Sequence, residues 1–375
     1  MVRLMTTAVA ALMLTASAQA ADFGANGVAD LEERIAELEA TTAKKGNRKV
    51  SLTVYGQVNK GILFWDDGDE SDQVVSENSS AESFVGFAGE AKINPNWRVG
   101  YVLEVGVGGY DDLIAGDDTN EIYTRNANLY IEGPMGRATL GHASQATDYI
   151  AEISTANTHV AARTLSLRPL NGPQVGEVLD LFDGQRANIV RYDTPLMGGF
   201  KASASWTNGD DDSEVWDAAL RYSGEFSGFQ IAAGVGYRDG IVIPTVASLG
   251  SAGNITVLSG SASVKHLQSG IFINAAAGQL SVEPFPSVEI DVTAWHLQGG
   301  VEQNWTGYGA TTLFMEYASV DIDEVEGSPT LWGAGIIQAF DAAAFDLYFN
   351  FRILDADDGS EDDVKTGMAG AKIRF

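Results

Sequence analysis

An alternation of apolar and polar side chains with a period of two runs from residue 50 to the end of this 375-residue chain. In residues 345–353 the apolar positions are Phe345, Leu347, Phe349, Phe351 and Ile353. Because side chains of a strand point alternately to its two faces, each such segment has one apolar and one wet face. No segment is apolar over the roughly 20 residues that a membrane-spanning helix needs. The pattern therefore predicts an all-β domain over residues 49–375.

Sixteen segments of this kind can be counted. They are 50–64, 83–93, 97–107, 122–132, 136–145, 187–195, 199–207, 214–223, 228–237, 256–267, 270–280, 293–304, 309–320, 330–340, 343–354 and 364–375. Their number is even, as in the closed antiparallel barrels of bacterial outer membranes.

The connections between the segments alternate in length. Every second one is a tight turn, at 94–96, 133–135, 195–198, 223–227, 268–269, 305–308 and 341–342. The intervening connections are long and acidic, for example 66–81, 108–121, 208–213 and 355–363. Short turns at one rim and long loops at the other are typical of an outer-membrane barrel, whereas a soluble sandwich has no reason to separate its loops this way. We therefore predict a 16-stranded antiparallel transmembrane β-barrel.

Aromatic side chains near the strand ends support a lipid-facing outer surface, because amphipathic rings form girdles at both membrane interfaces. The candidates are Tyr55, Trp97, Tyr101, Tyr192, Trp206, Trp216, Tyr222, Tyr237, Trp295, Tyr317 and Phe375. Tyr55 lies on the polar parity of its strand and fits this group poorly.

The N-terminus reads as a cleaved export signal over residues 1–20. Arg3 precedes an apolar stretch, and small residues end in Ala18-Gln19-Ala20, an A-x-A cleavage site. The alternative, a membrane anchor, needs a longer apolar stretch. No Cys follows the site, so a lipid-anchored lipoprotein is excluded.

Residues 21–48 are expected to form a short periplasmic helix and a basic linker. Val28, Leu31, Ile35 and Leu38 recur at spacings of three and four, the seam of a coiled coil. The alternative is an amphipathic helix lying on its own barrel. Two heptads are marginal alone, so the following domain is expected to set the number of copies.

Charge and composition exclude several classes of protein. The formal net charge of −28 becomes −29 once Arg3 is removed with the signal, which disfavours binding to nucleic-acid phosphates and favours cations as partners. The absence of Cys excludes a disulfide scaffold and a Cys-ligated metal site.

Three segments give the chain a resemblance to the Gram-negative general porins, the 16-stranded trimeric channels of the outer membrane. They are the opening strand 51–57, the segment 189–200 that ends in Gly198-Gly199-Phe200, and the terminal 371–375. The resemblance covers about residues 50–375 and implies a homotrimer in lipid and lipopolysaccharide. It also implies that Phe375 is the signal read by the barrel-assembly machinery. The helical leader is similar to the short coiled coils that some porins carry beneath the trimer.

The resemblance further implies that the longest connection, 146–186, folds inward and narrows the pore. Its acidic residues are Asp148, Glu152, Glu177, Asp180 and Asp183, and its basic residues are Arg163 and Arg168. Wall candidates share parity with polar neighbours and comprise Arg98, Arg191, Lys201, Arg221, Arg238 and Arg352, with Glu90, Glu104, Glu302, Glu316 and Asp346 of opposite sign.

Opposed charges across a narrow opening would filter solutes by size and charge without a chemical step. Each wall arginine has a second interpretation, a salt bridge that stiffens the barrel or anchors the loop. Strand bulges can shift parity by one residue, which keeps both interpretations open. Arg191 and Arg221 are the favoured constriction residues, because both have apolar outward neighbours.

No cofactor or structural metal site is expected. The acidic clusters at 66–70, 210–212 and 355–363 lack the ligand order of an EF-hand. They are interpreted either as solvated surfaces or as weak Ca²⁺ or Mg²⁺ sites that bridge neighbouring lipopolysaccharide.

We expect a passive diffusion channel for small hydrophilic solutes and ions with a cation preference. The alternative is a substrate-specific channel, for anions or a small organic solute, governed by the constriction arginines. An enzyme is disfavoured because the four His stand in no recognisable nucleophile motif. A structural tether would need a longer stalk, since about 17 helical residues rise only about 25 Å.

Overall fold

The computed structural model describes residues 49–107, 110–111, 118–119, 122–161, 182–208, 214–242, 253–285, 288–323, 327–355 and 363–375. The expected signal peptide at 1–20 and the helical segment within 21–48 lie outside these residues. Among the described residues, no helix has the length and apolar character to cross a membrane.

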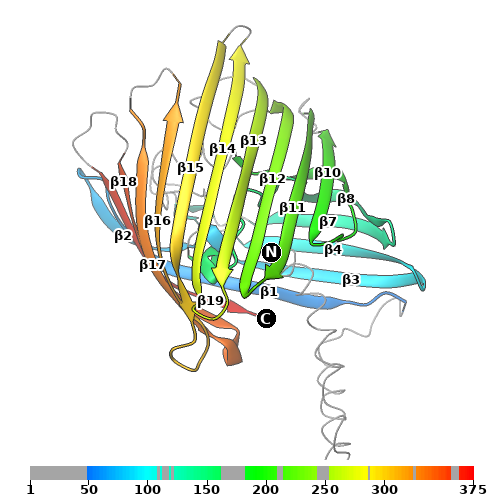
Figure 1. The fold of residues 1–375 in the computed structure, drawn as a ribbon, viewed down its shortest axis with the longest axis horizontal. Helices are drawn as coiled ribbons and strands as arrows, with labels where there is room; N and C mark the ends of the chain where they lie inside the picture. Colours follow the sequence, from blue (N-terminus) through cyan, green and yellow to red (C-terminus); the bar gives the residue numbers. More distant parts are fainter. Residues whose placement is uncertain are drawn as a thin grey trace, which may run out of the picture.

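The described chain folds into a closed antiparallel β-barrel (Figure 1). Its strands are β1 (Thr53–Asp66), β2 (Ser71–Glu77), β3 (Phe84–Asn94), β4 (Trp97–Val107), β7 (Ile122–Gly133), β8 (Gly136–Ser144), β9 (Arg186–Asp193), β10 (Phe200–Asn208), β11 (Glu214–Phe226), β12 (Phe229–Val242), β13 (Gly253–His266), β14 (Ile271–Phe285), β15 (Val288–Gln303), β16 (Thr311–Ile322), β17 (Thr330–Phe340), β18 (Phe345–Asp355) and β19 (Val364–Arg374). The strands β5 (Tyr110–Asp111) and β6 (Asp118–Thr119) pair only with each other.

The barrel has sixteen strand positions, because β2 and β3 pair with different parts of β1 and together fill one position. On its other side β1 pairs with β19, from Gln57↔Arg374 to Asp66↔Lys365, and this pairing closes the sheet. The predicted 16-stranded barrel is confirmed.

Most predicted strand boundaries lie within a few residues of the observed ones, and 97–107 and 330–340 coincide with β4 and β17. The predicted loop 66–81 is wrong in part, because Ser71–Glu77 forms strand β2 on β1. The strands β12 to β15 also extend beyond their predicted ends at the long-loop rim. In β2 most side chains on both faces are polar, so no alternation marks the strand. In the extension of β15 the alternation reverses, because Ile290 and Val292 face the interior whereas the polar Asp291 shares the outward parity of Trp295, so the pattern of a lipid-facing strand is lost.

The two faces of the barrel differ in chemistry, as alternation requires. Along β11, Trp216, Ala218 and Leu220 are exposed on the outer surface, whereas Val215 and Asp217 point inward and are buried. An apolar outer band with a polar interior is the arrangement of barrels that span the outer membrane.

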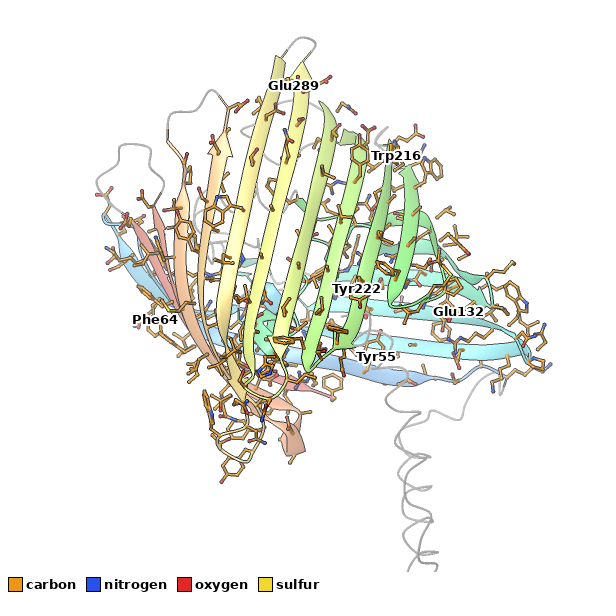
Figure 2. All side chains as sticks on the ribbon, viewed as in Figure 1. Tyr55, Phe64, Glu132, Trp216, Tyr222 and Glu289 are labelled. Atoms are coloured by element: carbon orange, nitrogen blue, oxygen red, sulfur yellow. The ribbon has the colours of Figure 1, made fainter. Side chains whose placement is uncertain are left out.

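Outer aromatic rings gather at two levels of the barrel. Trp295, Tyr317 and Trp332 form one row on neighbouring strands, with ring centroids 5.0 and 4.4 Å apart. Phe200 and Tyr222, 4.9 Å apart, lie nearer the short turns. Figure 2 shows Trp216 toward the long-loop end and Tyr222 toward the opposite end.

Tyr55 is a correction to the predicted outer group, because its ring points into the barrel. Its hydroxyl donates to Glu104 Oε1 at 2.7 Å. Gly86 on β3 leaves room for the ring, since a Cβ there would lie 2.6 Å from Tyr55 Cζ. Strict alternation likewise places Tyr55 on the polar face of its strand.

Candidate functional site

The chain that follows β8 runs inside the barrel along its wall. The Ala146 amide donates to Ser205 Oγ on β10 at 2.9 Å, and the Thr147 amide donates to Asp217 on β11 at 2.6 Å. Farther along, the Ile153 amide donates to Ser261 on β13 at 3.0 Å. We call residues 146–161 and 182–185 the inner loop.

The far part of the inner loop reaches the opposite side of the barrel. The Asn157 amide donates to Glu302 Oε2 on β15 at 2.7 Å. Asn350 on β18 donates through Nδ2 to the Ala161 carbonyl at 3.0 Å. The inner loop therefore crosses the inner faces of strands from β10 to β18 and narrows the interior.

Small residues on the wall make this close packing possible. A Cβ at Gly234 on β12 would lie 2.6 Å from Ile150 Cδ1, and one at Gly278 on β14 would lie 2.2 Å from Phe182 Cδ1. Ile150 and Phe182 are almost fully buried, so this part of the inner loop has an apolar core of its own against the wall.

Two of the predicted wall arginines, Arg221 and Arg238, bind the backbone of the inner loop, and a third, Arg191, binds the two residues just before it. Arg191 donates to the carbonyls of Ser144 and Gln145 at 3.0 and 2.8 Å. Arg221 donates to the Asp148 carbonyl and Arg238 to the Asp183 carbonyl, both at 2.7 Å. These side chains hold the loop to the wall, which is the second of the two interpretations given for each arginine.

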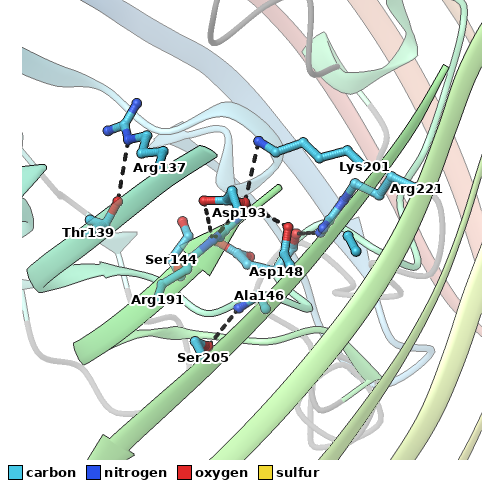
Figure 3. A network of polar contacts seen from close by, with 12 residues as sticks. Arg137, Thr139, Ser144, Ala146, Asp148, Arg191, Asp193, Lys201, Ser205 and Arg221 are labelled. Carbon is cyan, nitrogen blue, oxygen red and sulfur yellow. Dashed lines mark hydrogen bonds and ion pairs between the residues drawn. The ribbon is translucent and has the colours of Figure 1, made fainter. Parts of the chain in front are cut away.

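Four basic side chains lie on the neighbouring strands β8 to β11 beside the start of the inner loop, with Arg137 set apart from the other three (Figure 3). We call Arg137, Arg191, Lys201 and Arg221 the basic cluster. Asp193 accepts from Arg191 at 2.8 Å and lies 3.3 Å from Lys201 Nζ. Arg137 instead donates to Thr139 Oγ1 at 3.3 Å and stacks over the Tyr130 ring, 3.6 Å from its centroid. Positive charge is therefore concentrated on β8 to β11.

The described acids of the inner loop are Asp148, Glu152 and Asp183. Asp183 is partly buried, and its Oδ1 accepts the Ala151 amide at 2.8 Å, which ties the returning part of the loop to its outgoing part. Burial raises the pKa of the Asp183 carboxyl well above its usual range. Glu152 is buried. The predicted loop residues Arg163, Arg168, Glu177 and Asp180 lie outside the described residues.

A second charged group lies on the wall at β15, β16 and β18. Glu316 accepts from Arg352 Nε at 2.7 Å and from Gln298 Nε2 at 3.2 Å, and His296 Nε2 lies 3.2 Å from the same carboxylate. Glu316 is 3 % exposed and Arg352 is 4 % exposed. Both predicted wall residues therefore form a buried ion pair.

The remaining wall candidates are spread along the barrel. Arg98 lies near the short-turn rim, where it pairs with Glu132 at 2.7 Å and Glu90 at 3.8 Å, and so stands away from the inner loop. Glu302 pairs with Lys265 at 2.7 Å. Two further acids complete the set, namely Glu104 beside Tyr55 and Asp346 beside Arg374.

Arg125 is a charged wall residue that the sequence reasoning missed. It pairs with Glu82, lies 3.7 Å from Glu104 and stacks over Phe84. The register of β4 and β7 passes from Glu104↔Asn126 to Val105↔Thr124, so Arg125 is an extra residue in a bulge. A bulge re-aims a side chain, and alternation alone gives no sign of it.

Arg137, Asp193 and Asp217 were also missed, although each lies on the polar parity of its strand. Asp217 accepts from both the amide and the hydroxyl of Thr147, at 2.6 and 2.7 Å, and so anchors the inner loop. Among the described residues, no group of three or more His, Asp or Glu side chains is placed to hold a metal ion.

Comparisons with known proteins agree with this architecture. The family model described as Gram-negative porin matches residues 8–372. A solved anion-selective porin from Comamonas acidovorans superposes with a TM-score of 0.65 at 15% identity, covering 87% of this chain and 100% of that chain. The trimer form of OmpT, an outer membrane protein of Vibrio cholerae, gives 0.62 at 15% identity, with 87% and 99% coverage. OmpF of Salmonella typhi in complex with daunomycin gives 0.53 at 12% identity, with 88% and 99% coverage. No curated protein matches the chain significantly.

Proposed function

Because the chain belongs to the Gram-negative porin family and forms an outer-membrane channel, we propose that it passes small hydrophilic solutes and ions by passive diffusion, with a preference for cations. The observation that carries this proposal is the inner loop. A polar-lined barrel narrowed by a loop on its own wall can sort solutes by size and charge.

The cation preference is supported by a difference between the inner wall, where basic and acidic side chains commonly pair, and the long-loop rim, where acidic side chains are in excess. On the inner wall, bases are commonly paired with acids, as in Lys265–Glu302 at 2.7 Å, Arg352–Glu316 at 2.7 Å and Arg191–Asp193 at 2.8 Å. At the long-loop rim, the connection 66–72 carries five acids and no base. An unbalanced negative mouth raises the local concentration of cations.

The cation preference can be tested by the zero-current potential of the purified protein in a planar bilayer across a KCl gradient. Replacing Asp66, Asp67, Asp69 and Glu70 by Asn or Gln should lower the preference, most strongly at low salt, where screening is weakest. Asp341→Asn, at the short-turn rim, is the control. An unchanged potential in the fourfold variant would show that these acids do not set selectivity.

The second candidate function is a channel specific for anions or a small acidic solute. The basic cluster favours it, because Arg137 contacts a hydroxyl and an aromatic ring and Arg221 donates to a backbone carbonyl. These partners carry no negative charge that would compensate the two guanidinium groups. One solved structure with this fold is described as an anion-selective porin. An anion-selective potential that is lost in Arg137→Gln would establish this function in place of the first.

We further propose a homotrimer, since one solved relative in fold is described in a trimer form. The helix that carries Val28, Leu31, Ile35 and Leu38 would then form a coiled coil beneath it. Mass measurement in detergent should give three copies. Deleting residues 21–43 should leave that number unchanged if the barrel sets it.

The proposed contacts outside the chain are the assembly machinery and lipopolysaccharide. Phe375 has a largely exposed side chain, while its backbone pairs with Gly56 beside the β1–β19 closure. Deleting Phe375 should therefore reduce assembly in cells more than folding in detergent. Weak Ca²⁺ or Mg²⁺ at the acidic outer loops would bridge lipopolysaccharide, and calorimetric titration with each ion tests this.

A further inference from the structure

The strand beside β1 consists of β2 and β3, and six residues between them interrupt its pairing with β1. The ladder between β1 and β2 ends at Lys60↔Glu77, and the ladder between β1 and β3 resumes at Gln57↔Phe84. Two residues of β1 therefore face the six residues 78–83 of the neighbouring strand. We call 78–83 the inserted segment; it contains the short 3₁₀-helix η1 (Ser79–Ala81).

Side chains of β1 replace the missing ladder and hold the inserted segment. Gln57 Nε2 donates to the Glu82 carbonyl at 2.8 Å, and Asn59 Nδ2 donates to the Ala81 carbonyl at 2.9 Å. The Asn59 amide also donates to Ser83 Oγ at 2.9 Å. Because these contacts are buried or partly buried and every one has its partner, the inserted segment is a built part of the barrel.

The base of the inserted segment is closed by Glu77. Its carboxylate accepts the Ser83 amide and lies 3.5 Å from Lys60 Nζ. The Glu77 side chain is almost fully buried. The chain thus leaves the sheet after β2 and returns to it at β3 through a closed, hydrogen-bonded excursion.

The inserted segment meets the far end of the inner loop. Asn78 Nδ2 donates to the Val160 carbonyl at 3.0 Å, and Asn78 Oδ1 accepts the Ser80 amide at 2.9 Å. Asn78 is 1 % exposed. On the adjacent residue of the loop, the Ala161 carbonyl accepts from Asn350 of β18 at 3.0 Å. Two asparagines from different parts of the wall therefore hold consecutive carbonyls.

The side chains at this junction fill one side of the interior. Val160 and Ala161 are buried in an apolar cluster with wall residues of β1, β14, β16, β17, β18 and β19. The wall members are Leu63, Phe272, Phe314, Ile337, Tyr348 and Met368. An apolar packed cluster has no room for hydrated ions, so the path for solute lies elsewhere in the barrel.

We propose that the inserted segment is a clamp for the inner loop and that Asn78 is its positioning residue. By fixing where residues 157–161 cross the interior, the clamp sets the width of the open path. The consequence for conductance rests on the proposed function. The clamping of the loop does not, and it can be measured in a protein that conducts nothing.

The first test is hydrogen exchange of the folded, full-length protein in detergent. In Asn78→Ala, the Asn157 and Ala161 amides should exchange about tenfold faster, because a buried carbonyl loses its donor. Asn78→Asp keeps the acceptor for Ser80 but loses the donor to Val160, and should behave like Asn78→Ala. The control Asn304→Ala removes a similar turn contact, to the Gly307 amide at 2.8 Å, away from the loop.

The second test is single-channel recording of the same variants. Asn78→Ala should increase fluctuations of the open-channel current while the thermal unfolding midpoint of the barrel stays near that of Asn304→Ala. Deleting residues 79–82 leaves two residues opposite two on β1, so the ladder can continue. This deletion should raise the mean conductance.

The outcomes separate the clamp from the channel. Unchanged exchange at Asn157 and Ala161 in Asn78→Ala, Asn78→Asp and the deletion would overturn the clamp, whatever the conductance. Faster exchange in the variants, with no conductance in any variant or in the parent protein, would support the clamping of the inner loop and contradict the proposed channel function. Faster exchange with conductance and noise unchanged would reject the role of Asn78 in setting the path.

Discussion

At the scale of single residues, the interior is organised by buried charges that hold structure in place. Glu316 is enclosed with Arg352, and the two are joined by a hydrogen bond of 2.7 Å. Removing one partner of a buried pair leaves the other charge without compensation, which is far more destabilising than removing both.

Arg352→Met is therefore expected to destabilise the barrel by about 3 kcal/mol. The double variant Arg352→Met with Glu316→Gln should recover most of this loss. Denaturant unfolding in detergent measures both, with Arg98→Met at the exposed rim as the control. Equal stability of the single and double variants would contradict the assignment of a buried pair.

Asp183 links the inner loop to pH. Burial raises the pKa of its carboxyl above the usual value of 3.8, so the folded loop binds this proton more tightly than the unfolded chain does. The stability of the loop should fall as pH rises from the usual value through the raised pKa, and it should be greatest below that window.

Asp183→Asn keeps an oxygen for the Ala151 amide and removes the buried charge. We expect its loop amides to be protected about tenfold more than in the parent at pH 8, with little difference at pH 4. Protection factors of residues 148–153 measure this. Asp67→Asn is the control, since exposed Asp67 also accepts backbone amides, at 3.1 and 2.8 Å. Greater protection of the variant at pH 4 than at pH 8 would contradict the sign.

At the scale of elements, the inner loop keeps its place because the wall strands carry small residues beneath it. Gly278 on β14 is the tightest such position, since a Cβ there would lie 2.2 Å from the rigid ring of Phe182. A ring cannot move aside as the end of a flexible chain can, so a side chain here must displace the returning part of the loop.

Gly278→Val should therefore shift the loop and change the single-channel conductance while the barrel still forms. Adding Phe182→Ala should restore the parent conductance in large part, because the methyl groups then fill the vacated space. Gly299→Ala is the matched control, as its added Cβ would meet nothing closer than 3.7 Å. A parent-like conductance in Gly278→Val would show that the loop does not depend on this contact.

The sequence predicted the strands well because a lipid-facing wall enforces alternation. Where that constraint ends, prediction failed for a physical reason. The sequence predicts a loop where β2 forms, because Ser71–Glu77 carries mostly polar side chains on both faces and its pairing with β1 is a backbone property. Arg125 was missed because a bulge moved it off its parity.

The site was less predictable than the fold. The wall arginines could be recognised by parity, but their partners are loop carbonyls, as for Arg221 and Arg238, and carbonyls carry no sequence signal. The inserted segment also has no sequence signal, because its defining feature is that its six residues lie opposite only two residues of β1. Contacts between distant backbone segments require the three-dimensional structure.

At the scale of the whole molecule, closure of β1 on β19 makes a tube with a polar interior, and the inner loop narrows it. The excess of acids in the sequence, with a net charge of −28, is carried partly by long loops at one rim. The charge balance and the position of the inner loop support the proposed diffusion channel.

The most direct test of this account is the single-channel conductance of the purified protein in planar bilayers as KCl concentration is varied. A water-filled diffusion pore should show stable steps whose conductance rises nearly in proportion to the conductivity of the bulk solution, with a cation-selective zero-current potential. Conductance that saturates at low concentration, or steps that are absent from a correctly folded preparation, would contradict it.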